Sequence, residues 1–256
     1  MLETRDQEFQ PLDEAKVELD GVELWEIDRL RHLLGYDESE SLEPAMNRAK
    51  IAISKAKMKL SDHLVEGRTI GRPGETYITK YAAVLITFNA DIEKDEVAIA
   101  QAYFALIVDK QALEDEKRIR SRFEVNDENK RLAGAARASG VTDYAKFNGA
   151  GVSALYGGLS VSRIKARKGL SKSSNYLDFA GSEELAANLF RITQTRAALE
   201  RQQQRSERVA TGTHRMIGAN IRRTIIDAGN TPPEDLPAAK SNINTVATKK
   251  RKELKT

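Results

Sequence analysis

The residues best suited to chemistry in this sequence are cations that lie between Tyr144 and Leu177, a stretch without a single acidic residue. A Lys or Arg side chain that contacts a phosphate releases condensed counterions, so an uncompensated basic stretch favours polyanionic ligands. Serine and asparagine side chains lie between these cations and can donate hydrogen bonds to phosphate oxygens. We therefore predict a nucleic-acid contact, although a solvated surface with scattered cations is the common alternative. The cations are Lys146, Arg163, Lys165, Arg167, Lys168 and Lys172.

Four aromatic residues occur in the same stretch. An exposed ring can stack on an unpaired base and contribute about 1–3 kcal/mol, which favours single-stranded DNA as the ligand. The alternative is a place in the hydrophobic core, which is the commoner outcome for any one ring. We include Tyr156 in the predicted interface. The four residues are Tyr144, Phe147, Tyr156 and Tyr176.

A second group of arginines follows the first basic stretch. Arg201, Arg205 and Arg208 can share one face of a helix and form a short ridge. A solvated helix, on which Glu200 and Glu207 pair with these arginines, explains the pattern almost as well. The full set of predicted nucleic-acid-binding residues is Lys146, Tyr156, Arg163, Lys165, Arg167, Lys168, Lys172, Arg191, Arg222 and Arg223.

The charge of the chain is divided between its halves. Residues 1–128 contain 18 Lys and Arg against 28 Asp and Glu, whereas residues 129–256 contain 23 against 10. The net charge of +3 therefore hides an acidic half of −10 and a basic half of +13. The acidic half is not expected to provide the main DNA contact, except through a predicted helix face that carries Arg48, Lys50, Lys55, Lys57 and Lys59. It is better suited to a protein partner or to the basic half of a second copy.

Catalysis finds little support in the sequence. The absence of Cys excludes disulfides, thiolate zinc ligands and a Cys nucleophile. The Gly-rich runs at 67–74 and 148–158 lack the Lys-Ser/Thr pair of a phosphate-binding loop. None of the three histidines has the spacing of a metal ligand: they are His32, His63 and His214. We predict a protein that is not an enzyme and that has no cofactor and no bound metal.

One acidic cluster keeps a catalytic alternative open. It could in principle hold Mg²⁺ and support a metal-dependent nuclease. The commoner reason for such a cluster is that the dipole at a helix N-terminus favours acidic residues. The cluster consists of Asp91, Glu93, Asp95 and Glu96.

The composition predicts a cytoplasmic protein that is mainly α with a small N-terminal β element, an α+β fold. Apolar residues make up 40% of the chain and charged residues 31%, as in helix-rich globular proteins. The polar, acidic N-terminus does not resemble a secretory signal. The longest apolar run, at 81–86, is far shorter than the roughly 20 residues that span a bilayer, so no membrane partner is expected.

Local patterns predict the elements that must position the cations. Alternating apolar residues around Asp20-Gly21, a pair suited to a type I′ turn, predict a β-hairpin over 17–25. A long helix is expected from about residue 94, with a break near Asn126-Asp127. Two further helices, at 143–156 and 161–168, would be joined by a tight Gly157-Gly158 turn. This arrangement resembles a helix-turn-helix whose second helix carries the cations.

Four segments are expected along the chain. Residues 1–14 are predicted to be a flexible acidic lead, and 15–125 an N-terminal domain with the β element. Residues 126–230 are predicted to be a basic helical domain. Residues 231–256 are rich in Pro, Asn and Lys, and are predicted to be a disordered basic tail.

Several strings resemble known families. Residues 25–36, WEIDRLRHLLGY, resemble the signature of the Bro domain, named for baculovirus repeated open reading frames. The strings YGGLSVSRIKARKG at 156–169 and ELAANLFRITQT at 184–195 resemble bacterial DNA-damage-inducible protein D, as do YITKYAAVLI and QAYFA before them. The resemblance covers roughly 15–235. It implies a Bro-like N-terminal domain, a helical C-terminal domain and no catalytic residues.

The resemblance also implies a role. It implies induction in the SOS response to DNA damage, and association with DNA or with the recombinase filament on single-stranded DNA. We therefore predict a non-enzymatic protein that binds DNA, with single strands favoured, and that modulates recombinase filaments. The alternative is a module similar to phage antirepressors, which acts through protein contacts without binding DNA.

Overall fold

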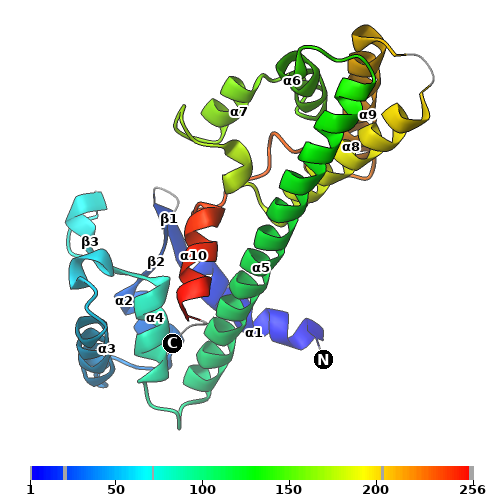
Figure 1. Cartoon of the computed structure of the whole chain (residues 1–256). Coiled ribbons are helices and arrows are strands. Elements are labelled where there is room, and N and C mark those ends of the chain that lie inside the picture. The colour runs from blue at the N-terminus through cyan, green and yellow to red at the C-terminus, as the bar shows by residue number, and fades with distance from the viewer. Residues whose placement is uncertain (1, 20–21, 71, 203–204, 254–256) are drawn as a thin grey trace. The chain divides into compact units, whose positions relative to one another are not determined.

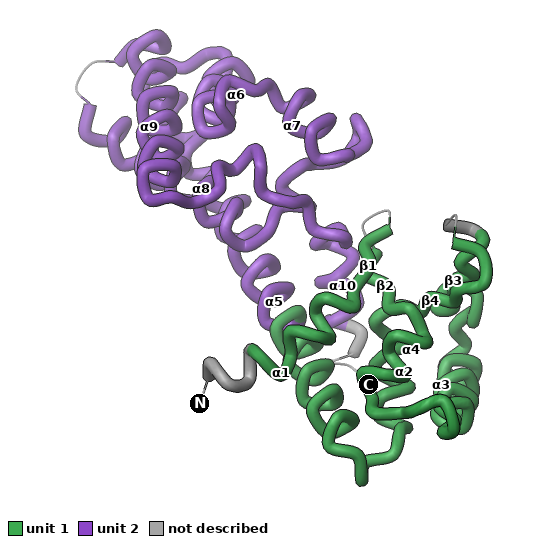
Figure 2. The backbone as a smooth tube through the Cα atoms, turned by 180° about the vertical axis from the view of Figure 1, so that it is seen from behind, with its two compact units in different colours: residues 1–111 green, residues 112–256 purple. Residues whose placement is uncertain are grey.

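The computed structural model describes residues 2–19, 22–70, 72–202 and 205–253. The chain divides into two compact units, residues 1–111 and 112–256 (Figure 2). The described residues are mainly helical with a small N-terminal sheet, so the predicted fold class is confirmed (Figure 1). No helix among them is both long and apolar enough to cross a membrane.

Unit 1 contains an antiparallel sheet of four strands in the order β1-β2-β4-β3. The strands are β1 (Lys16–Leu19), β2 (Val22–Glu26), β3 (Leu64–Glu66) and β4 (Thr76–Thr79). The predicted hairpin strands are confirmed as β1 and β2, whereas the Asp20-Gly21 turn lies outside the described residues. In the central pair of strands, Trp25 lies opposite Ile78, and both side chains are fully buried in the core of unit 1.

The helices of unit 1 all contribute buried residues to this core. They are α1 (Leu2–Glu14), α2 (Ile27–Leu33), α3 (Glu43–Lys55), α4 (Lys80–Phe88) and the first part of α5 (Asp95–Ala138). Short 3-10 turns follow Lys59 and Glu66. The prediction of a flexible lead over 1–14 is wrong for the described residues, because Leu12 is buried and Trp25 Nε1 donates a hydrogen bond to its carbonyl oxygen at 3.4 Å.

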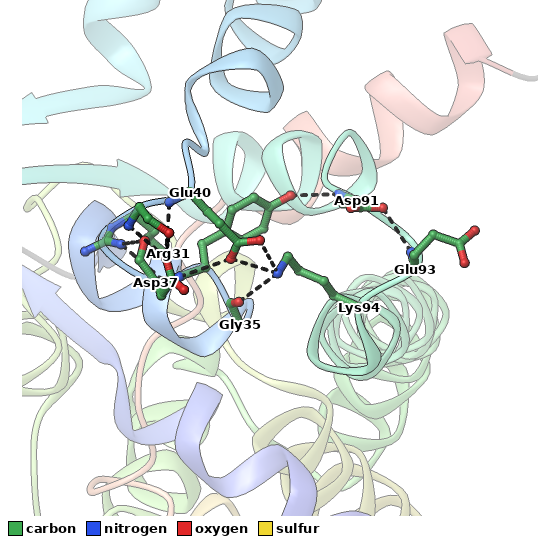
Figure 3. Close-up of polar contacts among 9 residues, drawn as sticks. Arg31, Gly35, Asp37, Glu40, Asp91, Glu93 and Lys94 are labelled. Atoms are coloured by element: carbon green, nitrogen blue, oxygen red, sulfur yellow. Dashed lines mark hydrogen bonds and ion pairs between the residues drawn. The ribbon is translucent and has the colours of Figure 1, made fainter.

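A polar cluster ties the loop after α2 to the start of α5 (Figure 3). Lys94 Nζ donates hydrogen bonds to the carbonyl oxygen of Gly35 at 3.0 Å and to the Glu40 carboxylate at 2.9 Å. The ammonium lies 5.0 Å from the centre of the Tyr36 ring, and the Tyr36 hydroxyl accepts a hydrogen bond from the Asp91 backbone at 2.8 Å. The hydrogen bond to Glu40 raises the pKa of Lys94, so the cation is held charged.

Unit 2 is built from helices around a second core. It contains the rest of α5, followed by α6 (Tyr144–Leu155), α7 (Val161–Arg167), α8 (Ser182–Arg201), α9 (Glu207–Asp227) and α10 (Ile243–Glu253). The predicted break near Asn126-Asp127 is wrong, because α5 continues to Ala138. Val125 and Leu132 are fully buried in this core, whereas Asn126 and Asp127 are exposed. The two polar residues therefore lie on the solvent side of an unbroken amphipathic helix.

Helices α6 and α9 run parallel and approach closely at two glycines. A Cβ atom at Gly151 would collide with the His214 ring, and one at Gly218 would lie 2.6 Å from the Gly151 carbonyl oxygen. At the start of both helices, Glu207 accepts hydrogen bonds from the backbone and hydroxyl of Thr142. These contacts fix α6, and through it the turn that leads to α7.

The prediction of a disordered tail over 231–256 is wrong for the residues described. Glu234 is buried, the Ala239 backbone donates a hydrogen bond to the Phe179 carbonyl oxygen at 2.7 Å, and Ile243 is 3% exposed at the start of α10. The prediction relied on the polar composition of this segment, which does not reveal the few specific contacts that order it.

Candidate nucleic-acid interface

The turn between α6 and α7 has the predicted form. Gly157 and Gly158 both adopt positive φ, at +61° and +89°, which glycine tolerates without strain. Ser160 caps α7 by accepting a hydrogen bond from the Arg163 backbone at 3.4 Å, and Ile164 is the only buried residue of α7. The short helix therefore presents most of its side chains to solvent.

Three predicted cations on α7 and the following loop remain accessible. Arg163 and Lys172 are exposed, and Lys165 is partly exposed, with its Nζ donating to the Lys172 carbonyl oxygen at 2.9 Å. Arg163 and Lys165 leave the helix in directions about 200° apart, so these two cations lie on nearly opposite sides of α7, with Lys172 beside Lys165. We call Arg163, Lys165 and Lys172 the α7 cations.

Two other predicted cations are neutralised by acids from the segment after α9. Arg167 pairs with Asp235, and Arg222 pairs with Glu234, to which its Nε donates at 2.9 Å. Arg167 belongs to the stretch without acidic residues, yet the fold brings it a carboxylate from 68 positions later in the sequence. We correct the prediction: neither guanidinium is free to bind a phosphate as the structure stands.

Lys168 and Tyr156 do not belong to an interface, because both side chains are buried. Lys168 Nζ lies 3.1 Å from a Glu184 carboxylate oxygen and donates to the Leu236 carbonyl oxygen at 2.6 Å. The Tyr156 hydroxyl donates to the other Glu184 oxygen at 2.7 Å. Burial raises the pKa of Glu184, and the nearby Lys168 opposes that rise. Both residues contribute to the interior of unit 2, so their predicted assignment to the nucleic-acid interface is wrong.

Arg191 is also buried, at 1% exposure, and its assignment to the interface is wrong. One guanidinium nitrogen donates to the Asn188 side chain at 3.3 Å, and another contacts His214 Nε2. Burial, followed by the charge of Arg191, lowers the pKa of His214 to about 3. The imidazole is therefore neutral and can accept the hydrogen bond from Arg191, which links α8 to α9.

Sequence reasoning missed this buried polar network, although a signal for it existed. Glu184, Asn188 and Arg191 follow one another at helical spacing. Leu185 and Ile192, both fully buried, lie beside them. Polar residues that share the buried face of a helix are typical of a hydrogen-bonded network in the core.

The last two predicted residues are exposed but lie on other helices. Lys146 is near the start of α6 and Arg223 near the end of α9. In the described part of the chain, neither has an ion-pair partner. The predicted ridge of Arg201, Arg205 and Arg208 is not formed on one helix, because α8 ends at Arg201 and α9 begins at Glu207.

The acidic cluster of the nuclease alternative does not form a metal site in the described residues. No group of three or more acidic or His side chains among them could hold a metal ion. The Asp91 carboxylate instead accepts a hydrogen bond from the Glu93 backbone at 3.1 Å (Figure 3).

Comparison with known proteins adds two findings. The family model described as the DinD C-terminal domain matches residues 112–246, nearly all of unit 2. DNA damage-inducible protein D of Escherichia coli (strain K12) is 38% identical, over 91% of this chain and 93% of that protein.

Proposed function

This chain belongs to the family of DNA damage-inducible protein D, and from that membership we propose a non-enzymatic role in the DNA-damage response. In this role, unit 2 binds DNA, with single strands favoured, and thereby modulates recombinase filaments. The observation that carries the proposal is the set of α7 cations, which stay accessible while their neighbours Arg167 and Lys168 are paired with acids.

Charge supports unit 2 as the DNA-binding part. Residues 112–256 contain 27 Lys and Arg against 16 Asp and Glu, a net charge of +11, whereas residues 1–111 have a net charge of −8. Exposed serines lie within α7 and on both sides of it, and can donate to phosphate oxygens. They are Ser160, Ser162, Ser171 and Ser173.

The shape of the cationic element favours a single strand. Helix α7 has only seven residues, and its cations point to different sides. A flexible strand can wrap around such a helix, whereas the phosphates of a duplex are held at fixed spacing. Base stacking contributes little to this preference, because Phe147, Tyr156 and Tyr176 are buried. Binding would depend mainly on the phosphate backbone, and thus on salt.

Competition for the strand would connect this binding to recombination. A recombinase filament assembles on single-stranded DNA, so a protein that occupies the same phosphates reduces the sites open to the recombinase. Since the α7 cations contact the backbone and not the base edges, the effect would be independent of sequence.

The test is a variant that replaces all three α7 cations, R163A/K165A/K172A. We expect a large loss of affinity for a single-stranded oligonucleotide, measured by fluorescence anisotropy across a salt series. The slope of log K against log salt should become shallower by about 2, because roughly 0.7 counterions are released per phosphate contact. The same variant should lose its effect on recombinase filament assembly.

The matched control is K117A/R137A/R215A, which removes the same charge from exposed positions on α5 and α9 that have no ion-pair partner in the described part of the chain. It should bind nearly as the parent does. If the α7 variant binds as tightly as this control, the site assignment is wrong. If the parent shows no salt-sensitive binding at all, the protein-interaction alternative is favoured.

A further inference from the structure

An open groove lies between α8 and α9 in unit 2. The two helices form an antiparallel hairpin, and the groove between them has a volume of about 590 Å³. Its lining is mostly apolar and includes Phe190 of α8, Ile217 and Ile221 of α9, and Leu236 of the following segment. Phe190 is 53% exposed, which is a large apolar surface to leave in water.

One stripe of α8 borders this groove along the whole helix. Its members are three or four residues apart, so they share a face of the helix. The ends of the stripe are charged, with opposite signs, and its centre is apolar or small. The stripe consists of Glu183, Ala187, Phe190, Gln194, Ala198 and Arg201.

This stripe is complementary to itself when a second copy is turned end to end. A two-fold axis near position 192 places Glu183 of one copy opposite Arg201 of the other, and Phe190 opposite Gln194. In the described part of the chain, neither Glu183 nor Arg201 has an ion-pair partner. Each copy would supply both charges, so the arrangement closes with two equivalent ion pairs, as an isologous interface requires.

We propose that the groove is occupied by α8 of a second copy of this chain, packed antiparallel, so that α8 and α9 of both copies form a four-helix arrangement. The Phe190 ring of each copy enters the groove of the other beside Gln194, one helical turn from the small side chain of Ala198. Apolar burial at the centre supplies the attraction. The charges at the ends select the antiparallel direction, because a parallel pair would bring like charges together.

Charge exchange tests the proposal by sedimentation velocity on the full chain. E183R and R201E should each weaken self-association by at least about tenfold, since each places like charges together at both ends of the interface. The double variant E183R/R201E should restore it. The control is E200R, which changes a neighbouring charge on a different side of α8 and should leave self-association unchanged.

Cross-linking tests the direction of packing without relying on affinity. The sequence contains no Cys, so single cysteines report cleanly. A mixture of the E183C and R201C proteins should be joined by a short bifunctional maleimide, whereas each protein alone should not. Circular dichroism checks that every variant is folded.

A chain that stays monomeric at all concentrations, or a double variant that stays dissociated, would overturn the proposal. A folded parent that instead binds a helix of another protein in this groove would also overturn it. The outcome is independent of DNA binding, because the α7 cations take no part in the stripe.

Discussion

At the scale of single residues, the interior of unit 2 depends on a buried ion pair between Lys168 and Glu184. The two side chains are 2% and 0% exposed, and the carboxylate also accepts the Tyr156 hydroxyl. Replacing one member of a buried pair leaves the other charge without compensation in a medium that solvates it poorly.

The neighbouring lysine and arginine allow a matched test of this pair. We expect Lys168→Met to lower the free energy of unfolding by about 3–5 kcal/mol. Arg167→Met removes an ion pair whose members are 53% and 41% exposed, and should cost less than about 1 kcal/mol. Urea unfolding of both variants measures the difference. Equal losses would show that burial of the Lys168 pair has no energetic consequence.

His214 should give unit 2 a distinct response to acid. Its pKa is about 3 in the folded chain against an ordinary value of 6.5, because burial and Arg191 disfavour the imidazolium. Between these values the unfolded chain binds a proton that the folded chain does not. Stability from this group is therefore complete above pH 6.5 and declines as the pH falls toward 3, by about 1.4 kcal/mol per pH unit.

The measurement is the difference between the parent and His214→Gln, which keeps a hydrogen-bond acceptor but cannot gain the proton. Between about pH 7 and about pH 5.5, the free energy of unfolding should decrease more for the parent than for the variant. Parallel declines in the two proteins would contradict the assignment of a neutral buried imidazole.

At the scale of secondary structure elements, the contact between α6 and α9 depends on glycine. The side chain of Gly151→Ala would collide with the His214 ring, so we expect a loss of about 1–3 kcal/mol as the helices separate. Gly149→Ala is the control on the same helix, because nothing lies within 4 Å of its added Cβ. That variant should gain up to about 1 kcal/mol from helix propensity. Thermal unfolding of both variants tests this contrast: the melting temperature should fall for Gly151→Ala and should rise or stay unchanged for Gly149→Ala.

The sequence alone predicted those elements that are marked by residues within or directly beside them. Ser160 stands directly before α7 and caps it, the double glycine ends α6, and alternating residues predicted the β1–β2 hairpin. β3 and β4 were not predicted, because they are short and no two-residue turn such as Asp20-Gly21 joins them.

The candidate site could be predicted only in part, for a different reason. Whether a cation is free depends on partners far away in the chain. Lys168 meets Glu184, and Arg167 meets Asp235, 68 residues later. No spacing rule connects such pairs, so the sequence located the basic region but could not separate its accessible cations from its structural ones.

At the scale of the whole molecule, the two units have separate hydrophobic cores. The buried residues of one core end at Phe104, and those of the other begin at Val125. We therefore expect a fragment of residues 112–256 to fold by itself, with helical circular dichroism, cooperative unfolding and the parent's affinity for single-stranded DNA. A fragment that unfolds without a cooperative transition would show that its core needs residues 1–111.

The segment after α9 sets how much positive charge unit 2 displays. It supplies Glu234 and Asp235 to two guanidinium groups and the Leu236 carbonyl oxygen to Lys168. A protease that cut just after Gly229 would thus remove two masking carboxylates along with a stabilising strap. The same cut would remove six Lys and Arg with only three Asp and Glu, so the shortened chain would uncover Arg167 and Arg222 while its net positive charge fell by 3 and its core weakened.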